Sequence, residues 1–107
     1  QHTALIVDDN QSAREIMCDI VSQLGMQTSQ CGSGDCALTH VRNHPTDVVF
    51  MDWKMPNMDG LETSQAIAEM NLAKPPAIIM VTAYGREEIA DEVEQHPLIL
   101  GMLTISP

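Results

Sequence analysis

Four polar residues stand where short apolar runs end, and their types could do chemistry. They are Asp8, Asp9, Asp52 and Thr82. Apolar runs of about four residues without alternation are typical of strands that are covered on both faces, and so of a parallel sheet. In such a sheet the carboxyl ends of the strands meet at one edge, where ligands bind. We therefore expect these four side chains to gather in one pocket.

Three carboxylates in one pocket would favour a bound cation. Two carboxylates about 4 Å apart repel by roughly 4 kcal/mol at an effective dielectric constant near 20. Oxygen ligands favour Mg²⁺ or Mn²⁺ over zinc, and Mg²⁺ commonly keeps positions for water and phosphate oxygens. The cluster therefore predicts a metal-dependent, phosphate-handling site. Taken singly, any one of these aspartates could instead start a turn or cap a helix.

The elements that must position these residues can be predicted from the apolar pattern. The clearest helix follows the first acidic pair, and its apolar stripe comprises Ala13, Ile16, Met17, Ile20, Val21 and Leu24. Ser12 and Glu15 match a capping box, and Gly25 stands where a left-handed C-terminal residue is expected. Weaker helices are predicted at 35–43, 61–70 and 86–95. The strands are expected at 4–7, 26–30, 48–51, 78–81 and 98–103.

This order of elements predicts an α/β fold, a doubly wound parallel sheet with helices on both faces. At 107 residues the chain suits one domain, 1–107. Fifteen acidic residues against five basic ones leave a net charge of −10, which disfavours nucleic acid and anionic membranes as partners. No apolar run approaches the roughly 20 residues that span a bilayer, so we expect no direct membrane contact.

The number and spacing of the cysteines do not indicate a structural disulfide. Cys18, Cys31 and Cys36 are an odd number without C-x-x-C spacing. Neither a disulfide framework nor a zinc site is predicted from them. A reducing, cytoplasmic setting is therefore expected. The stretch Gly32-Ser33-Gly34 is interpreted as a turn that leads into a helix, in preference to a dinucleotide-binding loop.

The segment from Asp52 to Gly60 resembles the phosphoacceptor loop of the response-regulator receiver family, D-x-x-M-P-x-M-D-G. The acidic pair after the first strand and the Thr82-Ala83 pair after the fourth match the family's other motifs. The resemblance extends over residues 3–104 and is closest to receivers of hybrid sensor histidine kinases. It implies a five-stranded sheet of flavodoxin-like order 2-1-3-4-5, with the family's final helix absent from this chain.

The resemblance also implies roles for the residues at the strand ends. Asp52 would accept a phosphoryl group from a phosphohistidine of a histidine kinase or a histidine phosphotransfer domain. Asp9, Asp52 and the backbone carbonyl of Lys54 would bind Mg²⁺, or Mn²⁺, directly, and Asp8 would bind it through water. Thr82 would turn its hydroxyl toward the phosphoryl group and act as the switch. Such a domain catalyses its own phosphotransfer and dephosphorylation, free in the cytoplasm or as the cytoplasmic part of a membrane-anchored kinase.

Three further positions would modulate this chemistry by the same resemblance. Ala83 is small and would leave the phosphoryl site open. Lys54 and Tyr84 either flank the pocket and tune dephosphorylation or are ordinary solvated side chains. Met102 stands where many receivers have an aromatic switch residue, and a flexible thioether can repack without a discrete flip. Pro56 is expected to fix a tight turn, and Gly60 to permit a backbone conformation that larger residues resist.

One departure from the family leaves the function open. The family places a lysine followed by proline directly after the position of Thr104, but Ile105 follows here and no lysine occurs after Lys74. Either the two residues are missing from the sequence as read, which we expect, or they are truly deleted. A true deletion would weaken phosphoryl binding and indicate a non-phosphorylated pseudo-receiver that acts as an interaction module.

Two more alternatives concern the reaction and the surface. A Mg²⁺-dependent phosphatase with Asp52 as nucleophile is disfavoured, because Lys54 stands where such an enzyme needs a general acid. The acidic segment 86–95 is interpreted as a solvated face, although the corresponding region helps to form the signalling surface of receivers. A homodimer is compatible with the family.

Overall fold

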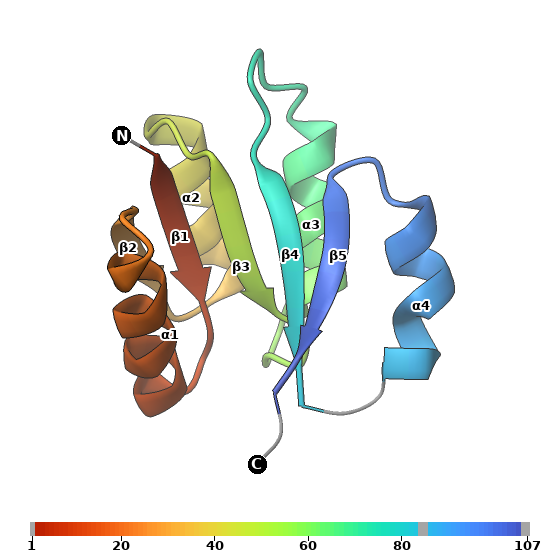
Figure 1. Cartoon of the computed structure of the whole chain (residues 1–107). Coiled ribbons are helices and arrows are strands. Elements are labelled where there is room, and N and C mark those ends of the chain that lie inside the picture. The colour runs from red at the N-terminus through yellow and green to blue at the C-terminus, as the bar shows by residue number, and fades with distance from the viewer. Residues whose placement is uncertain (1, 84–85, 106–107) are drawn as a thin grey trace.

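The computed structural model describes residues 2–83 and 86–105. Five parallel strands form one sheet in the order β2-β1-β3-β4-β5, as Figure 1 shows. The strands are β1 (Thr3–Val7), β2 (Gln27–Cys31), β3 (Val48–Asp52), β4 (Ala77–Thr82) and β5 (Ile99–Thr104). The helices are α1 (Gln11–Gln23), α2 (Gly34–Asn43), α3 (Gly60–Glu69) and α4 (Arg86–Gln95). The predicted fold class, element order and strand order are confirmed.

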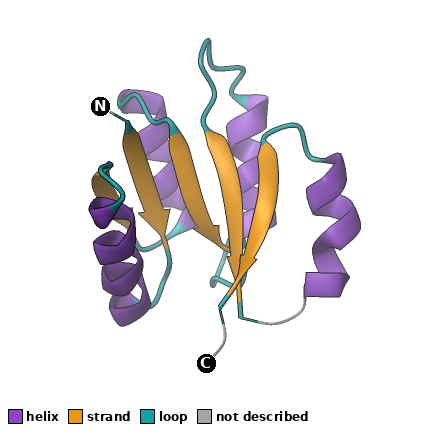
Figure 2. Ribbon diagram, viewed as in Figure 1, coloured by secondary structure: helices purple, strands orange, loops and turns teal. Residues whose placement is uncertain are grey.

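The sheet has helices on both faces, as Figure 2 shows. Successive strand residues point to opposite sides of the sheet, so each strand contributes side chains to both layers. Leu5 and Val7 belong to the larger buried cluster, which packs against α2, α3 and α4. Ala4 and Ile6 belong to a smaller cluster under α1. β1 is buried on both faces, which explains why it is a continuous apolar run.

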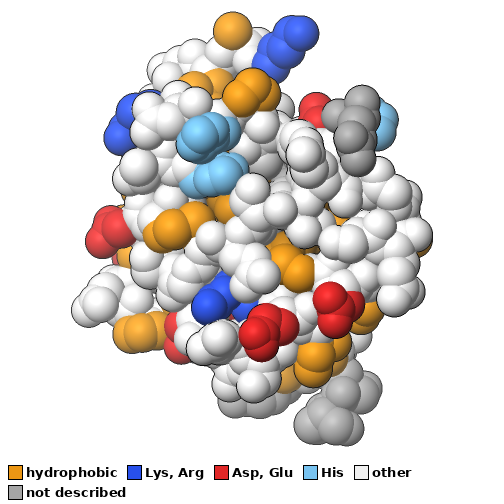
Figure 3. Space-filling model, turned by 90° about the vertical axis from the view of Figure 1, so that its left-hand side faces the viewer, with side chains coloured by type: hydrophobic (Ala, Val, Ile, Leu, Met, Phe, Trp, Pro, Cys, Tyr) orange, Lys and Arg blue, Asp and Glu red, His pale blue; other side chains and the backbone are white. Residues whose placement is uncertain are grey.

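Helix α1 covers its face of the sheet only in part. Cys18 and Val21 are its buried residues. Of the predicted apolar stripe, Ile16 is 61% exposed, Ile20 52% and Leu24 71%. Figure 3 looks onto the left-hand side of Figure 1, and apolar side chains reach the surface there. The helix was predicted correctly, but much of its apolar stripe stays exposed, because α1 is the one helix of the described chain on this face.

The start of α1 also differs from the prediction. Asn10 is the N-cap, and its side chain accepts a hydrogen bond of 2.9 Å from the Ala13 N–H. Ser12 lies inside the first turn, so the capping box of Ser12 and Glu15 was wrong. Gly25, with φ +92°, adopts the left-handed conformation that the sequence predicts for the end of this helix.

A disulfide joins Cys31, the last residue of β2, to Cys36 in the first turn of α2, while Cys18 is a buried free thiol. The prediction that no cysteines pair was therefore wrong. The four residues between them include the predicted turn, Gly32-Ser33-Gly34, and Ser33 caps α2 by accepting a hydrogen bond from the Cys36 N–H. Because this turn folds back on itself, the Cα atoms of the two cysteines lie 5.5 Å apart, within the range that a disulfide spans.

Across residues 2–83 and 86–105, the structure contains no helix that is both long enough and apolar enough to cross a membrane.

Candidate functional site

Three aspartates meet at the carboxyl edge of the sheet, the lower edge in Figure 1. Asp8 directly follows β1 and Asp52 ends β3, and these two strands pair with Val7 opposite Met51. One carboxylate oxygen from each of Asp8, Asp9 and Asp52 lies within 4.8 Å of the others. Asp8 and Asp52 are half-buried and Asp9 is exposed. We call these three residues the acidic cluster.

The acidic cluster holds its negative charge at a cost. Burial, and then repulsion by Asp8 and Asp9, raises the pKa of Asp52 to about 7. Burial also raises the pKa of Asp8, against the hydrogen bond from the backbone of Asn10. The raised pKa means that charge on Asp52 is disfavoured in the metal-free molecule near neutral pH. A cation would remove this cost by stabilising the charged form, and the all-oxygen donor set fits a hard divalent ion.

Asp8 is held in place by contacts on three sides. Its side chain accepts a hydrogen bond of 2.9 Å from the Asn10 N–H. Its own N–H donates to the Cys31 carbonyl at 3.1 Å. The Arg14 guanidinium donates to the Asp8 carbonyl at 2.8 Å and, through Nε, to the Gln30 side chain at 3.0 Å. Asp8 is thus fixed by residues of α1 and of β2.

The loop after Asp52 is anchored to the sheet at both ends. The Trp53 N–H donates to the Val81 carbonyl at 3.1 Å, and the Gly60 N–H donates to the Trp53 carbonyl at 2.7 Å. A Cβ at Gly60 would collide with the Asp52 carbonyl oxygen and lie 3.0 Å from Met51 Cγ. Glycine is therefore needed here for space. The predicted reason, an unusual backbone conformation, was wrong, because Gly60 is not among the residues with positive φ.

The tight turn in this loop is centred on Asn57. Its φ is +70°, a left-handed value that asparagine tolerates better than most residues. The Met58 N–H donates to the Pro56 carbonyl at 2.8 Å and closes the turn. Pro56 therefore lies in a tight turn, as expected. The turn brings the chain back toward β3.

The last aspartate of the loop, Asp59, is structural. It is the N-cap of α3, where its side chain accepts a hydrogen bond of 2.8 Å from the Glu62 N–H. The Glu62 side chain in turn accepts one of 3.0 Å from the Asp59 N–H. This capping box fixes the start of α3 directly after the phosphoacceptor-like loop.

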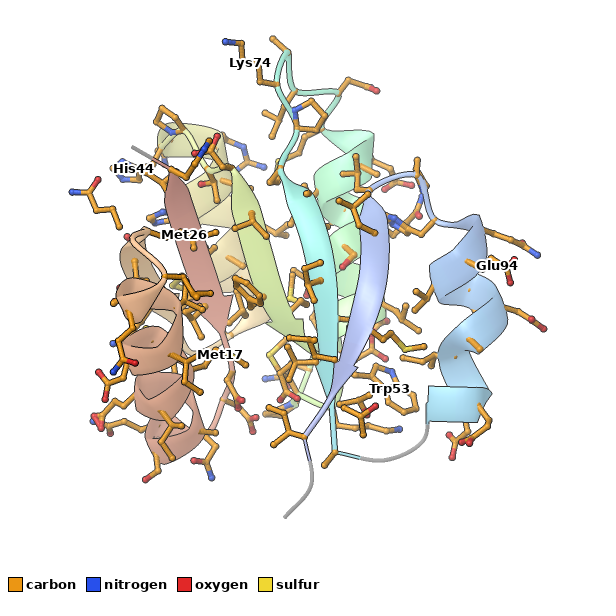
Figure 4. The ribbon with its side chains drawn as sticks, viewed as in Figure 1. Met17, Met26, His44, Trp53, Lys74 and Glu94 are labelled. Carbon is orange, nitrogen blue, oxygen red and sulfur yellow. A yellow bond between two sulfur atoms is a disulfide. The ribbon has the colours of Figure 1, made fainter. Side chains whose placement is uncertain are left out.

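Lys54 and Trp53 follow Asp52, and their side chains contact each other. The Lys54 ammonium lies 4.0 Å from the centroid of the Trp53 ring, a cation–π contact. Trp53 is buried in the cluster that includes Ile89 and Val93 of α4, and Figure 4 places it near the start of that helix. The predicted role of the Lys54 carbonyl as a metal ligand stays a prediction.

The remaining predicted positions lie on β4 and β5 or just beyond them. Thr82 is buried at the end of β4, paired with Thr104, and Ala83 is exposed. Tyr84 lies outside the described residues. Met102 pairs with Met80 and packs against the larger buried cluster, so it lies on the face covered by α2, α3 and α4.

Ile105 borders the acidic cluster at the position directly after Thr104. Its N–H donates to the Thr82 carbonyl at 2.9 Å. A small cavity is lined by Ile105 together with Asp8, Asp52 and Phe50. The side chain that follows β5 at the acidic cluster is therefore apolar in this chain.

The residues that sequence reasoning missed are those that support the cluster. Asn10 and Arg14 hold Asp8, and the Cys31–Cys36 disulfide lies one hydrogen bond from it. A usable signal was present for Asn10, since asparagine is a favoured N-cap residue and this one stands three residues after the end of β1. The arginine contacts had no such signal, because they depend on how α1 lies over β2.

The comparisons with known proteins agree with this arrangement. Residues 4–99 match the family described as response regulator receiver domain. The chain is 33% identical over 100 residues to sporulation initiation phosphotransferase F of Bacillus subtilis, which covers 94% of this chain and 76% of that protein. It is 40% identical over 63 residues to the CAI-1 autoinducer sensor kinase/phosphatase CqsS of Vibrio cholerae, covering 59% of this chain and 9% of that protein.

Among solved structures, the chain resembles response regulator protein TrrA of Thermotoga maritima, solved in complex with Mg²⁺-BeF. The TM-score is 0.83 at 25% identity, and the match covers 99% of this chain and 88% of that one.

Proposed function

Because the chain belongs to the response regulator receiver family of two-component signalling, we propose that Asp52 is its phosphoacceptor and that the acidic cluster binds Mg²⁺. The observation that carries this proposal is the convergence of three carboxylates within 4.8 Å, with the pKa of Asp52 raised to about 7. Structural aspartates at turns are dispersed and solvated, whereas these repel one another. A bound cation would offset this repulsion.

The proposed ligands follow from their places in the fold. Asp9, Asp52 and the Lys54 backbone carbonyl would hold Mg²⁺, or Mn²⁺, directly, with Asp8 acting through water. When bound, the cation neutralises charge on the carboxylates and on phosphoryl oxygens. The complex of TrrA with Mg²⁺-BeF supports a cation in this family's fold.

The reaction requires the charged form of Asp52. One of its oxygens attacks the phosphorus of a phosphohistidine, the P–N bond breaks, and an acyl phosphate forms on Asp52. The histidine ring leaves with the electron pair of that bond and is protonated by solvent. The buried Thr82 hydroxyl would then bind a phosphoryl oxygen and couple phosphorylation to the segment that leads to α4. Ala83 adds no bulk beside it.

Receivers interact with histidine kinases or with phosphotransfer proteins, and one of these is the phosphodonor in this proposal. We further propose that this chain is the receiver of a hybrid sensor histidine kinase. The 40% identity to a segment of a sensor kinase/phosphatase supports this context. The match to sporulation initiation phosphotransferase F leaves a separate receiver as the competing arrangement.

One observation favours a second candidate, a pseudo-receiver that acts only as an interaction module. Ile105 places an apolar side chain beside Asp8 and Asp52, where the family's lysine would contact the phosphoryl group. The substitution Ile105→Lys distinguishes the two. If this chain is a degenerate receiver, wild type gains no phosphate and the lysine variant gains some.

The test of the proposed function is incubation with Mg²⁺ and acetyl phosphate, followed by intact-mass measurement. We expect wild type to gain one phosphoryl group that is labile in both acid and base, as an acyl phosphate is, and Asp52→Ala to gain none. No gain in wild type, or an equal gain in the variant, would exclude Asp52 as the phosphoacceptor. Omitting Mg²⁺ should abolish the gain, because the acidic cluster then lacks its countercharge.

A further inference from the structure

The Cys31–Cys36 disulfide joins the sheet to α2 beside the acidic cluster, and no part of the proposed phosphotransfer uses it. Cys31 is 2% exposed and belongs to the larger buried cluster. Cys36 is exposed. A surface hollow is lined by both cysteines together with Gln30, Asp35 and Thr39. A reductant can therefore approach the disulfide from the Cys36 side.

The disulfide ties down an edge strand that buries only one side chain. β2 is an edge strand, paired with β1 alone. Its sequence is polar, and Cys31 is the one buried residue of its five. An edge strand with a single buried side chain depends on its ends for order. The covalent link to α2 supplies that order at the end of β2 nearest Asp8.

A short chain of contacts connects this end of β2 to the acidic cluster. The Cys31 carbonyl accepts the hydrogen bond from the Asp8 N–H at 3.1 Å. On the other side, Gly34 packs so closely that an added Cβ would collide with Thr63 Oγ1 and lie 2.9 Å from Met58 Sδ, in the loop after Asp52. The disulfide-closed turn thus contacts Asp8 through the Cys31 carbonyl and, through Gly34, the loop that follows Asp52.

We propose that the Cys31–Cys36 disulfide is a reversible thiol–disulfide exchange site for a dithiol reductant, and that opening it loosens Asp8 and weakens cation binding at the acidic cluster. The effect on cation binding rests on the proposed function, whereas the thiol–disulfide exchange itself does not. The two glycines of the turn make the open form flexible, since they restrict the backbone least. The closed form holds the Cys31 carbonyl against Asp8.

The exchange balances as a two-electron reduction. A thiolate of the dithiol attacks Cys36 Sγ, the S–S bond breaks, and Cys31 leaves as a thiolate that takes up a proton. The second thiol of the reductant then attacks its own sulfur in the mixed disulfide and releases Cys36. The protein ends with two thiols, and the dithiol ends as a disulfide.

The first measurement counts thiols and is independent of Mg²⁺. Unfolded, unreduced protein should show one reactive thiol, Cys18, and protein treated with dithiothreitol before unfolding should show three. In the folded, reduced protein, iodoacetamide should label Cys36 fastest, because Cys18 and Cys31 are buried and burial raises the pKa of the Cys18 thiol. Three thiols before reduction, or a disulfide that resists dithiothreitol in the folded state, would overturn the proposal.

The second measurement follows the coupling to Asp8. Reduction should speed hydrogen exchange of the Asp8 amide and weaken Mg²⁺ binding about fivefold, the lower end of usual coupling between sites. Trp53, the one tryptophan, reports the binding by fluorescence. Cys36→Ser should behave as the reduced protein does, both with and without reductant. Cys18→Ala should respond to reductant as wild type does.

The outcomes separate the two proposals. If reduction leaves the hydrogen exchange of the Asp8 amide unchanged, the coupling between the disulfide and Asp8 is refuted, whether or not Mg²⁺ binding changes. If Mg²⁺ binds in neither redox state, the proposed function fails, while the thiol count and the Asp8 exchange still decide the redox proposal.

Discussion

The acidic cluster and helix α4 are both rich in carboxylates, but the fold places them in opposite situations. In α4, every acidic side chain is exposed. They are Glu87, Glu88, Asp91, Glu92 and Glu94. In the cluster, strands β1 and β3 bring three carboxylates together at the sheet edge, two of them half-buried. Repulsion in water is weak and screened, whereas in the partly buried pocket burial, and then repulsion by Asp8 and Asp9, raise the pKa of Asp52 to about 7. Convergence and burial, rather than the number of charges, make a site.

The largest expected effect is on cation binding. Asp9→Asn should weaken Mg²⁺ binding at least tenfold, because even residues that only support metal ligands cost about 10- to 100-fold. Glu88→Gln, an equal loss of one exposed charge on α4, should leave the affinity unchanged within about twofold. Titration followed by Trp53 fluorescence measures both. Equal losses in the two variants would show that only the overall charge of the protein matters.

A second prediction concerns the backbone beneath Asp52. Gly60→Ala should destabilise the fold by about 1–3 kcal/mol, the usual cost of overpacking, because its Cβ meets the Asp52 carbonyl. Gly101→Ala is the matched control, since a Cβ there meets nothing within 4 Å, and it should change stability by less than about 0.5 kcal/mol. Urea unfolding gives both values. A harmless Gly60→Ala would mean that the loop is not packed against β3 as described.

The third prediction concerns the repulsion itself. Asp52→Asn should stabilise the metal-free protein by about 1–2 kcal/mol at pH 8, a figure reduced from the full pKa shift because the side chain is only half-buried. Asp91→Asn, on α4, should change stability by less than about 0.5 kcal/mol. Thermal or urea unfolding without Mg²⁺ makes the comparison. Destabilisation by Asp52→Asn would contradict repulsion in the cluster.

The pH dependence has the same origin. Folding raises the pKa of Asp52 from 3.8 to about 7, so the folded state binds more protons than the unfolded state between these values. Stability of the metal-free protein should therefore fall as pH rises from about 4 to about 7, and this part of the slope should be lost in Asp52→Asn. Mg²⁺ should bind more tightly as pH rises through 7, because the proton on Asp52 must leave. Urea unfolding across this range, with and without Mg²⁺, tests both signs.

The smallest expected effect is on α4. Glu92→Lys should change the free energy of unfolding by less than about 0.5 kcal/mol, because the side chain is exposed and its charge is screened. Unfolding in 0.1 M and 1 M salt measures it. A larger, salt-independent loss would mean that α4 uses this carboxylate in packing.

The acidic cluster could be predicted because its position depends on local features that the sequence carries. Asp8 and Asp52 each follow an apolar run, and parallel strands bring their carboxyl ends to one edge. The disulfide could not be predicted in this way. Whether Cys31 and Cys36 meet depends on how sharply the turn between them folds back, and the spacing alone does not define that.

Packing across elements explains the other differences. The apolar stripe of α1 predicted the helix correctly. Periodicity does not tell how much of the apolar face is covered by other elements, and Ile16 and Leu24 are exposed. The reason predicted for a glycine at position 60 was wrong. Gly60 approaches the Asp52 carbonyl closely, and this is a contact between the start of a helix and the end of a strand. The choice of Asn10 over Ser12 as N-cap depends on where the chain leaves β1, and the two positions are about half a helical turn apart.

The most direct test of the central claim locates the phosphoryl group. Wild-type protein is incubated with Mg²⁺ and acetyl phosphate, the acyl phosphate is reduced with borohydride, and the modified residue is identified by peptide mass spectrometry. The account predicts modification at Asp52 alone, dependent on Mg²⁺. Modification at another residue, or none at all while Ile105→Lys is modified, would contradict it.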